Sequence, residues 1–376
     1  MKFRLLDVVV CPKCNGQFDV NAKTLTEGDI KDISMPDNRC SDRCAYHEFL
    51  NKSIPFKSCA ECYTKEIKKG TLSCKTCGEV YQIEDNIPRL VNTKLSSKTE
   101  ATKESFGYLW MRGPGIPRKP RSDSGSKYHF DKVAHFAEPL PKNGLWLDAG
   151  CGNGSDVRVM SKYDARRKEI VGLDISEGGI REAYVKNAHN PFVHIVQGDI
   201  IRIPFKKHIF DFAYSYGVLH HIENPTSGIR EINRVLKKEK EALIYLYEDF
   251  SDRNFIERLL LKAVNTMRRF TTQLPHHALY AGCLALSPIV YIFLTLPARL
   301  LGNFRKTASL ATRIPYHHSK GFFNVVMDIY DRFSAPIEIR YSRTDAFELL
   351  NKNGFKNVGI AKKRGWVVWG TKAENV

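Results

Sequence analysis

The sequence predicts an α/β fold with a doubly wound sheet, preceded by a small cysteine-rich domain and interrupted by a helical insertion near its end. A glycine-rich turn separates a buried strand from a helix at residues 145–156. Three strands in succession end at or beside an aspartate, and paired cysteines are concentrated in residues 1–91. These patterns indicate a ligand-binding sheet edge and a separate metal-binding domain.

The turn segment 145–156 has the sequence Leu-Trp-Leu-Asp-Ala-Gly-Cys-Gly-Asn-Gly-Ser-Asp. An apolar run containing Asp148 is followed by Gly150, Gly152 and Gly154, and apolar residues then resume with helical spacing. Glycines are needed where the backbone turns with positive φ and a ligand approaches it closely. The spacing differs from the G-x-G-x-x-G of dinucleotide-binding domains, so the glycines alone fit structural punctuation equally well.

The strands after this turn favour a binding site. Residues 170–174 form a second buried-type strand that ends in Asp174, and residues 192–199 form a third that ends in Asp199. An acid at the position of Asp174 can accept hydrogen bonds from both ribose hydroxyls of a nucleotide. Packing of the sheet core does not explain carboxylates that gather at one common edge. We therefore expect this edge to bind a ligand.

Four segments carry a family resemblance: residues 147–154, 172–176, 197–200 and 210–221. In order and spacing they resemble class I S-adenosylmethionine-dependent methyltransferases of the type 11 kind. The resemblance implies a seven-stranded Rossmann-like methyltransferase sheet and S-adenosyl-L-methionine as cofactor. Where that family has a Pro-Gly-Gly turn before its fifth strand, this chain has Lys237–Glu241, which we expect to alter a surface turn only.

The resemblance also implies roles for single residues. The three glycines would lie under the methionine end of the cofactor. Asp174 would hold the ribose, Asp199 would lie beside the adenine, and Ser215 would lie near the sulfonium. The implied cofactor residues are Asp148, Gly150, Gly152, Gly154, Asp174, Ile175, Asp199, Ile200 and Ser215.

Two histidines follow the fourth strand and are candidate catalytic residues. Methyl transfer is an in-line displacement in which positioning dominates, and a neutral hydroxyl acceptor also needs a base. His220 is the first candidate base and His221 the second. The alternative is that both are core or capping histidines at a structural turn.

Residues 1–91 contain eight of the ten cysteines. Cys11 and Cys14 form one C-x-x-C pair, Cys74 and Cys77 form another, and a glycine follows each pair closely. Two such knuckles supply the four thiolates of a zinc ribbon. The amino terminus has no secretory signal pattern, so we expect metal thiolates in the cytoplasm rather than disulfides.

An inner set of cysteines lies between the two knuckles. Cys40 and Cys44 are paired in sequence, as are Cys59 and Cys62, and His47 is nearby. This set is a candidate second zinc site, and the alternative is free thiols or a disulfide.

The cysteine-rich region carries a second resemblance. The segments 5–14, 72–83 and 86–90 are similar to the small zinc-ribbon protein that activates several tRNA and ribosomal methyltransferases, here fused to one chain. Residues 20–57 are an insert relative to the minimal ribbon.

The rest of the chain can be divided by composition. Residues 92–140 are polar and rich in proline, which predicts a linker and amino-terminal cap. Within them, Ser105–Trp110 resembles the element that folds over the cofactor in some methyltransferases, and the alternative is an aromatic anchor that docks the linker on the core. Residues 141–248 and 343–376 are expected to form the core, with 249–342 inserted between its fifth and sixth strands.

The insertion contains the uncharged segment Ala278–Ala298. Its length suits a membrane span, but strands of one sheet lie on both sides of it, which argues against a single crossing. Pro288 is expected to divide it into two short apolar pieces. The segment therefore predicts either an apolar hairpin at a membrane interface, flanked by basic residues, or a buried lid over the active site.

The formal charge of +17 points to nucleic acid or an anionic membrane surface, unless it reflects only a basic proteome. We expect a methyltransferase that acts on a hydrophobic, lipid-anchored or glycan-linked small molecule. The protein would be cytoplasmic, with peripheral contact to the inner face of the membrane. The alternatives are an RNA methyltransferase that binds RNA through the ribbon and basic surface, and a non-catalytic cofactor-binding scaffold.

Overall fold

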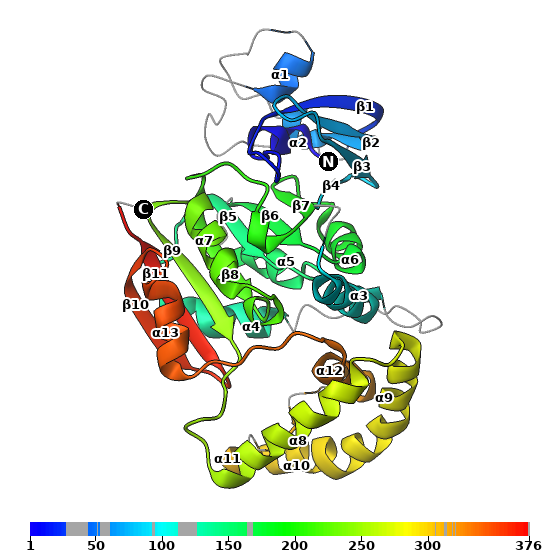
Figure 1. Cartoon of the computed structure of the whole chain (residues 1–376), viewed down its shortest axis with the longest axis vertical. Coiled ribbons are helices and arrows are strands. Elements are labelled where there is room, and N and C mark those ends of the chain that lie inside the picture. Colours follow the sequence, from blue (N-terminus) through cyan, green and yellow to red (C-terminus); the bar gives the residue numbers. More distant parts are fainter. Residues whose placement is uncertain are drawn as a thin grey trace. The chain divides into compact units, whose positions relative to one another are not determined.

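The structure is a computed structural model, and the chain forms two compact units (Figure 1). The first unit consists of Met1–Ser96, Lys119–Asp249 and Ile339–Val376, and the second of Ser97–Arg118 and Phe250–Glu338. The described residues are 1–27, 44–50, 52, 61–91, 95–111, 126–163, 168–304, 306–311, 314–317, 319 and 321–374, without the side chains of 126–128 and 308.

The first unit is built on a sheet with the strand order β1-β2-β3-β4-β7-β6-β5-β8-β9-β11-β10. Its last seven strands, from β7 to β10 in this order, are the predicted doubly wound sheet, which is confirmed. β5 to β9 are parallel, and β11 is antiparallel to both of its neighbours. The bounds are β5 Gly144–Ala149, β6 Lys168–Asp174, β7 Val193–Gly198, β8 Phe210–Tyr216, β9 Leu236–Leu246, β10 Phe355–Lys362 and β11 Trp366–Lys372.

Helices pack against this sheet because each buries one apolar face. α7 begins where the Asn224 side chain accepts a hydrogen bond from Ser227 N, and α13 begins after Ser342, whose Oγ accepts from Asp345 N at 3.1 Å. The stretch Lys237–Glu241 is part of β9 rather than a free turn. The bounds are α4 Ser126–Val133, α5 Ser155–Lys162, α6 Glu177–Asn187, α7 Pro225–Val235 and α13 Arg343–Asn351, with short 3₁₀ turns η2 Ala134–Ala137, η4 Ile200–Arg202 and η5 Leu219–His221.

The cysteine-rich region contributes the first four strands and joins the same sheet. β4 pairs in parallel with β7, with Arg89 opposite Gln197 and Leu90 opposite Gly198. Residues 1–91, which the sequence predicts to be a zinc-ribbon domain, belong to the same compact unit as the core. The bounds are η1 Phe3–Asp7, β1 Phe18–Glu27, α1 Ala45–Phe49, α2 Glu61–Thr64, β2 Lys65–Cys74, β3 Val80–Glu84 and β4 Ile87–Leu90.

A buried ionic cluster lies where this region meets the core. Glu169, at the start of β6, is fully buried and accepts from Arg4 Nε at 2.9 Å. His194 Nε2 lies 2.9 Å from the same carboxylate, and the Tyr63 hydroxyl donates to it at 3.3 Å. Burial alone would raise the pKa of Glu169, but Arg4 and His194 outweigh it and hold the pKa well below its usual range.

The second unit is helical and includes part of the segment expected to be a linker. α3 (Ser97–Met111) packs on α12 (Phe322–Ser334), where Ser105 Oγ donates to Ser334 Oγ at 2.7 Å. The Tyr108 ring lies 5.5 Å from the Tyr330 ring and 5.7 Å from the His276 ring. The aromatic segment Ser105–Trp110 therefore packs against helices of the insertion within the second unit. Its expected roles, folding over the cofactor or docking the linker on the core, stay predictions.

The segment Ala278–Ala298 does not form the expected apolar hairpin. α9 (His276–Val290), the π-helical turn η6 (Tyr291–Thr295) and α10 (Leu296–Gly302) form one helical segment. Pro288 lies inside α9, and the wider turn η6 follows it, which is a usual way for a helix to continue past a proline. His276–Gly302 is long and apolar enough to cross a membrane by length and composition, and only 22% of its most apolar window is buried. The remaining helices of the unit are α8 Phe255–Thr271 and α11 Ala308–Ala311.

Replacing Arg4 by Met should destabilise the first unit, because Glu169 would lose its main cation while remaining buried. Removing one partner of a buried ion pair costs about 3–5 kcal/mol. Thermal unfolding should show a clearly lower midpoint. The matched control is Lys352→Met, which breaks the exposed pair between Lys352 and Glu348 and should leave the midpoint unchanged. Equal midpoints for the two variants would contradict this role for Arg4.

Candidate functional site

The glycine turn lies at the carboxyl end of β5 and is fixed to the end of β6. Gly150 N donates to Leu173 O at 2.7 Å, and Cys151 N donates to the same oxygen at 2.9 Å. Gly150 has φ of +94°, and a Cβ added there would lie 2.2 Å from Val218 Cγ2. Only glycine fits this position, because both the backbone conformation and the space exclude a side chain.

Asp174, at the end of β6, holds this turn in place. Its Oδ2 accepts from Gly152 N at 2.8 Å, and its Oδ1 accepts from Ser176 N at 2.8 Å and from Ser176 Oγ at 2.6 Å. Burial raises the pKa of Asp174, and these hydrogen bonds oppose the rise. A carboxylate offers about four acceptor positions. The three hydrogen bonds above occupy three of these positions. If Asp174 is to accept hydrogen bonds from both ribose hydroxyls, one hydroxyl must therefore replace one of the present donors.

Two more carboxylates lie beside the turn. Asp148 is buried, and its Oδ2 has no hydrogen-bond partner among the described residues. Asp156 Oδ1 is also buried without such a partner in the described chain, while its Oδ2 accepts from the Tyr214 hydroxyl at 3.3 Å. Sequence reasoning did not assign Asp156, although it directly follows the glycine motif.

Burial disfavours the anionic form of these acids, and Asp148 is also disfavoured by the charges of its two neighbours. Burial, and then the charges of Asp156 and Asp174, raise the pKa of Asp148 well above its usual range. Burial raises the pKa of Asp156 to about 7, although the Tyr214 hydrogen bond opposes the rise. A cationic ligand would relieve both effects. S-adenosylmethionine carries an ammonium and a sulfonium, so the residues present fit this cofactor.

The predicted adenine side lies at the carboxyl end of β7. Asp199 Oδ1 accepts from Ile201 N at 3.1 Å and begins the turn η4, and both Asp199 and Ile200 are buried. Gln197 Nε2 donates to Ile175 O at 2.9 Å, which connects the ends of β6 and β7. The structure therefore brings Asp174, Ile175, Asp199 and Ile200 to one edge of the sheet.

The cysteine-rich region supports the same loop from both sides. Strand β4 pairs with β7 up to Gly198, directly before Asp199. After the loop, Val10 N donates to Pro204 O at 2.9 Å and Lys206 Nζ donates to Asp7 O at 2.7 Å. The residues expected beside the adenine are thus held between two contacts to the amino-terminal region, which the sequence did not predict.

The carboxyl ends of β8 and β9 form an aromatic edge, defined by Tyr216, Tyr245, Tyr247 and His220. The ring centroids of Tyr216 and Tyr245 are 4.2 Å apart, and those of His220 and Tyr247 are 3.7 Å apart. His220 is fully buried and His221 is nearly so. The catalytic role of these histidines stays a prediction.

Ser215 is buried at the end of β8, and its hydroxyl donates to Ala149 O at 2.8 Å. The hydroxyl thereby connects β8 to the strand that carries the glycine turn. This position next to the turn is compatible with the implied place near the sulfonium, which stays a prediction.

The outer cysteines converge as expected. Cys11 Sγ lies 3.7 Å from Cys77 Sγ, and Cys14 Sγ lies 3.4 Å from Cys74 Sγ. All four sulfurs lie within 4.8 Å of one another. A tetrahedral zinc site with four thiolates places its sulfurs about 3.8 Å apart. The four residues therefore fit a zinc ion.

The inner cysteines are only partly described, because Cys40 and Cys59 lie outside the described residues. Cys44 and Cys62 are buried, and His47 Nδ1 lies 3.2 Å from Cys44 Sγ. Hydrogen bonds from Cys62 and then His47 lower the pKa of Cys44 to about 4, against the effect of burial. A second zinc site here stays a prediction.

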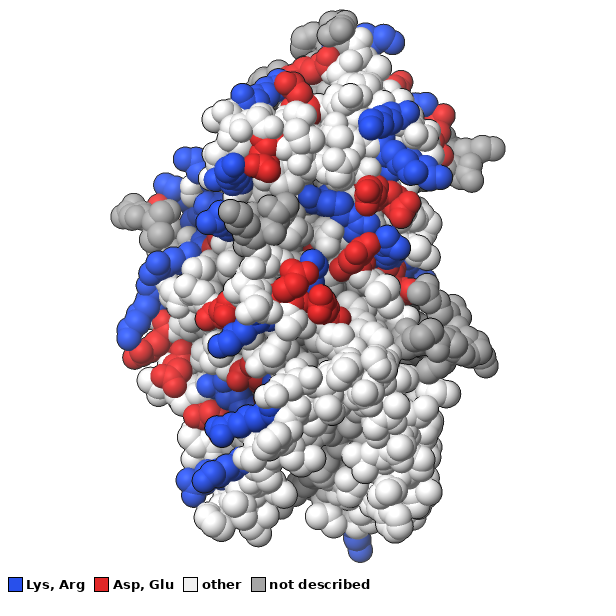
Figure 2. All heavy atoms as spheres, turned by 45° about the vertical axis from the view of Figure 1, so that its right-hand side comes forward, with Lys and Arg blue, Asp and Glu red and all other residues white. Residues whose placement is uncertain are grey.

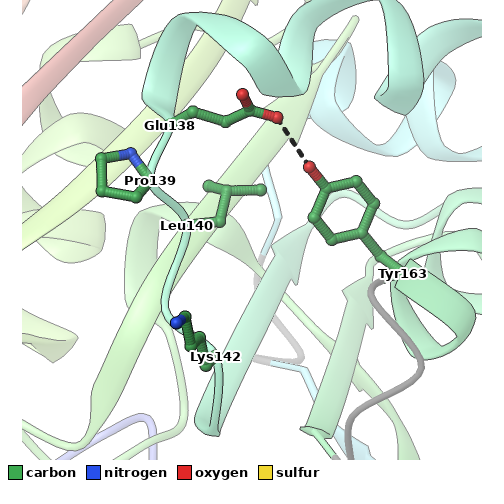
Figure 3. A pocket seen from close by; sticks show the side chains of 5 residues that line it. All are labelled: Glu138, Pro139, Leu140, Lys142 and Tyr163. Carbon is green, nitrogen blue, oxygen red and sulfur yellow. Dashed lines mark hydrogen bonds between the residues drawn. The ribbon is translucent and has the colours of Figure 1, made fainter.

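A pocket in the first unit lies apart from the cofactor site (Figure 3). It lies where the chain enters β5, at the amino edge of the sheet, whereas the glycine turn follows the carboxyl edge. The Tyr163 hydroxyl donates to Glu138 Oε1 across it at 2.8 Å. The lining residues are Glu138, Pro139, Leu140, Lys142 and Tyr163.

Comparison with known proteins agrees with both resemblances. Residues 147–244 match a family model described as a methyltransferase domain, and residues 2–86 match one described as Trm112p-like protein. The chain is 27% identical to 24-methylenesterol C-methyltransferase 2 of Arabidopsis thaliana over 41% of its own length and 42% of the relative's. It is 32% identical to the tRNA (carboxymethyluridine(34)-5-O)-methyltransferase of Saccharomyces cerevisiae over 31% of its own length and 39% of the relative's.

These curated relatives are matched over less than half of their length. Among solved structures, a complex of the Haloferax volcanii Trm112 methyltransferase activator with a putative methyltransferase matches 72% of this chain and 98% of that chain, at 13% identity and a TM-score of 0.40. By the two family matches, the chain carries a methyltransferase domain of the S-adenosylmethionine-dependent class after a Trm112p-like domain.

Proposed function

We propose that the protein transfers a methyl group from S-adenosylmethionine to a hydrophobic, lipid-anchored or glycan-linked small molecule. The observation that carries the acceptor class is the insertion, which leaves the core just after the aromatic edge and exposes many large apolar side chains. Such a segment suits an acceptor that is poorly soluble in water. With such an acceptor, the reaction would take place at the cytoplasmic face of a membrane.

The chain's own residues would position the reactants. S-adenosylmethionine would supply an electrophilic methyl on its sulfonium. With a cationic cofactor bound, Asp148 and Asp156 would provide negative charge next to the glycine turn, and Asp174 fixes the turn itself. Because the displacement is in line, the main contribution is the alignment of the acceptor with the methyl.

A neutral acceptor needs a group that takes its proton, and His220 is the first candidate. Its ring is stacked on Tyr247 at the aromatic edge, and Ile339 N donates to its backbone oxygen at 2.8 Å. This packing fixes the ring, which suits a positioned base. His221, whose ring centroid lies 4.4 Å from that of His220, is the second candidate.

RNA is the second candidate acceptor, and the Trm112p-like domain favours it. One relative named above acts, by its name, on tRNA, and the net charge of +17 suits a nucleic-acid partner. Aromatic rings at a sheet edge can also stack on unpaired bases.

Incubating the purified protein and cell extract with S-adenosylmethionine labelled on its methyl group should transfer label to the organic-soluble fraction. Extraction separates lipid, RNA and protein before counting. Label in RNA would replace the proposal by the second candidate. A chain that binds the cofactor but labels no fraction would support a non-catalytic scaffold.

Replacing Asp174 by Ala should weaken cofactor binding at least tenfold, because each lost charge-assisted hydrogen bond costs about 1.5–3 kcal/mol. Titration calorimetry with S-adenosylmethionine measures this. The matched control is Asp211→Ala at the amino edge of the sheet, where the carboxylate also accepts from a backbone N–H, that of Leu145. The control should lower stability without weakening binding. Undiminished affinity of Asp174→Ala would contradict the assignment.

Metal analysis should find zinc bound by Cys11, Cys14, Cys74 and Cys77, and Cys74→Ser should remove it. Structural zinc contributes folding free energy, so its loss should unfold the ribbon. Because the ribbon supports the Asp199 loop, we also expect weaker cofactor binding after chelation. Protein without zinc would refute the site, and two zinc ions per chain would support the inner cysteines as a second site.

A further inference from the structure

The insertion exposes an unusual amount of apolar surface. Of the large apolar side chains that are exposed in the described chain, all but Leu25, Val80, Met111 and Val185 lie between Phe255 and Phe323. The side chains of Phe255, Phe270 and Phe293 are 70%, 70% and 71% exposed. The lower part of Figure 2, where Figure 1 places the insertion, shows a broad and largely uncharged surface. Surfaces of this kind mark interaction sites.

Helix α8 is divided into three faces. Leu261 and Arg268 are buried on one face, where Arg268 pairs with Glu338 and bonds backbone oxygens near the end of α12. At about 100° per residue, the exposed apolar residues fall in one arc of about 140° that holds no charged residue. This arc consists of Phe255, Ile256, Leu259, Leu260, Met267 and Phe270.

The basic residues of α8 lie directly beside the apolar arc. Arg258, Lys262 and Arg269 are exposed and fall within an adjacent arc of about 40°. An apolar face bordered by Lys and Arg is typical of helices that lie in the interface of an anionic membrane.

The α9–α10 segment has two apolar faces. Leu279, Cys283 and Thr295 are buried, and the first two belong to the cluster that contains Val326 and Tyr330 of α12. On the outer side, Leu286, Ile289, Phe293 and Leu300 recur at helical spacing and are 43% to 71% exposed. The inner face explains the fold of the unit, whereas nothing in the described chain covers the outer one.

The charges of this region are of one sign. Between Arg258 and Met327 the sequence contains nine Lys or Arg residues and no Asp or Glu. A partner with an apolar interior and a negatively charged surface complements this combination.

We propose that the exposed apolar faces of α8 and α9–α10, together called the docking face, rest on an anionic lipid bilayer. The α9–α10 segment would lie on the bilayer rather than cross it. α12 packs along its inner face and carries Asp328, Asp331 and Arg332, which a crossing would carry into hydrocarbon at high cost.

This inference deepens the proposed function and rests on it for its bearing on the acceptor. A chain held at the bilayer surface meets a lipid-anchored acceptor by diffusion in two dimensions. Docking itself involves neither the glycine turn nor the acids, so it can be measured without any methyl transfer.

The test is flotation of the zinc-loaded chain with lipid vesicles. One set of vesicles contains phosphatidylcholine alone, and the other also contains about 30 mol% phosphatidylglycerol, which makes the surface anionic. Binding should be strong only with the anionic lipid and should fall as salt rises, because screening acts over about 8–10 Å. The variant Phe270→Ser/Phe293→Ser should reduce binding at least tenfold. Lys262→Gln and Arg269→Gln should each weaken it about fivefold.

The matched control is Val185→Ser, at an equally exposed apolar position on α6 of the first unit. It should bind vesicles like the wild type. Far-ultraviolet circular dichroism and thermal unfolding should match the wild type for all variants, which shows that both units are folded. Calorimetry with S-adenosylmethionine should give the same affinity for all variants. Vesicle binding without label in lipid would refute the acceptor class while leaving the docking face in place.

Three results would overturn the inference. The wild type could ignore anionic vesicles, or Phe270→Ser/Phe293→Ser could bind them unchanged. Sedimentation could instead show a dimer that this variant dissociates, in which case the docking face is an interface between copies. Protein that resists alkaline extraction from the vesicles would show a crossing helix instead.

Discussion

The parallel pairing of β4 with β7 is the contact on which the rest of the first unit depends. It is short, yet it ends directly before Asp199, at the edge where the acids and glycines converge. The ionic cluster around Glu169 reinforces it at the amino edge. The Trm112p-like region is therefore part of the structure that shapes the proposed cofactor site.

The acids at the glycine turn impose an opposing constraint. Burial raises the pKa of Asp148, Asp156 and Asp174, and the charges of Asp156 and Asp174 raise that of Asp148 further. A core optimised for stability would avoid this arrangement. Their presence is understandable where a cation is bound, since perturbed carboxyls concentrate at functional sites.

Short-range patterns in the sequence were sufficient to predict the core. Gly150 and Asp174 belong to motifs in which spacing along the chain determines geometry, and Cys11 and Cys74 belong to knuckles with the same property. The pairing of β4 with β7 could not be predicted, because it joins residues about a hundred positions apart and leaves no local pattern. The predicted break at Pro288 failed for the opposite reason. Proline usually ends a helix, but here α9 packs on α12 and continues past it.

Because β4 and β7 belong to the same polypeptide, their association is an intramolecular equilibrium. The effective concentration of one for the other is set by the connecting chain and does not change when the protein is diluted. An activator supplied as a separate subunit would dissociate at low abundance and would be shared among competing enzymes. Here the stoichiometry of the two regions is fixed at synthesis.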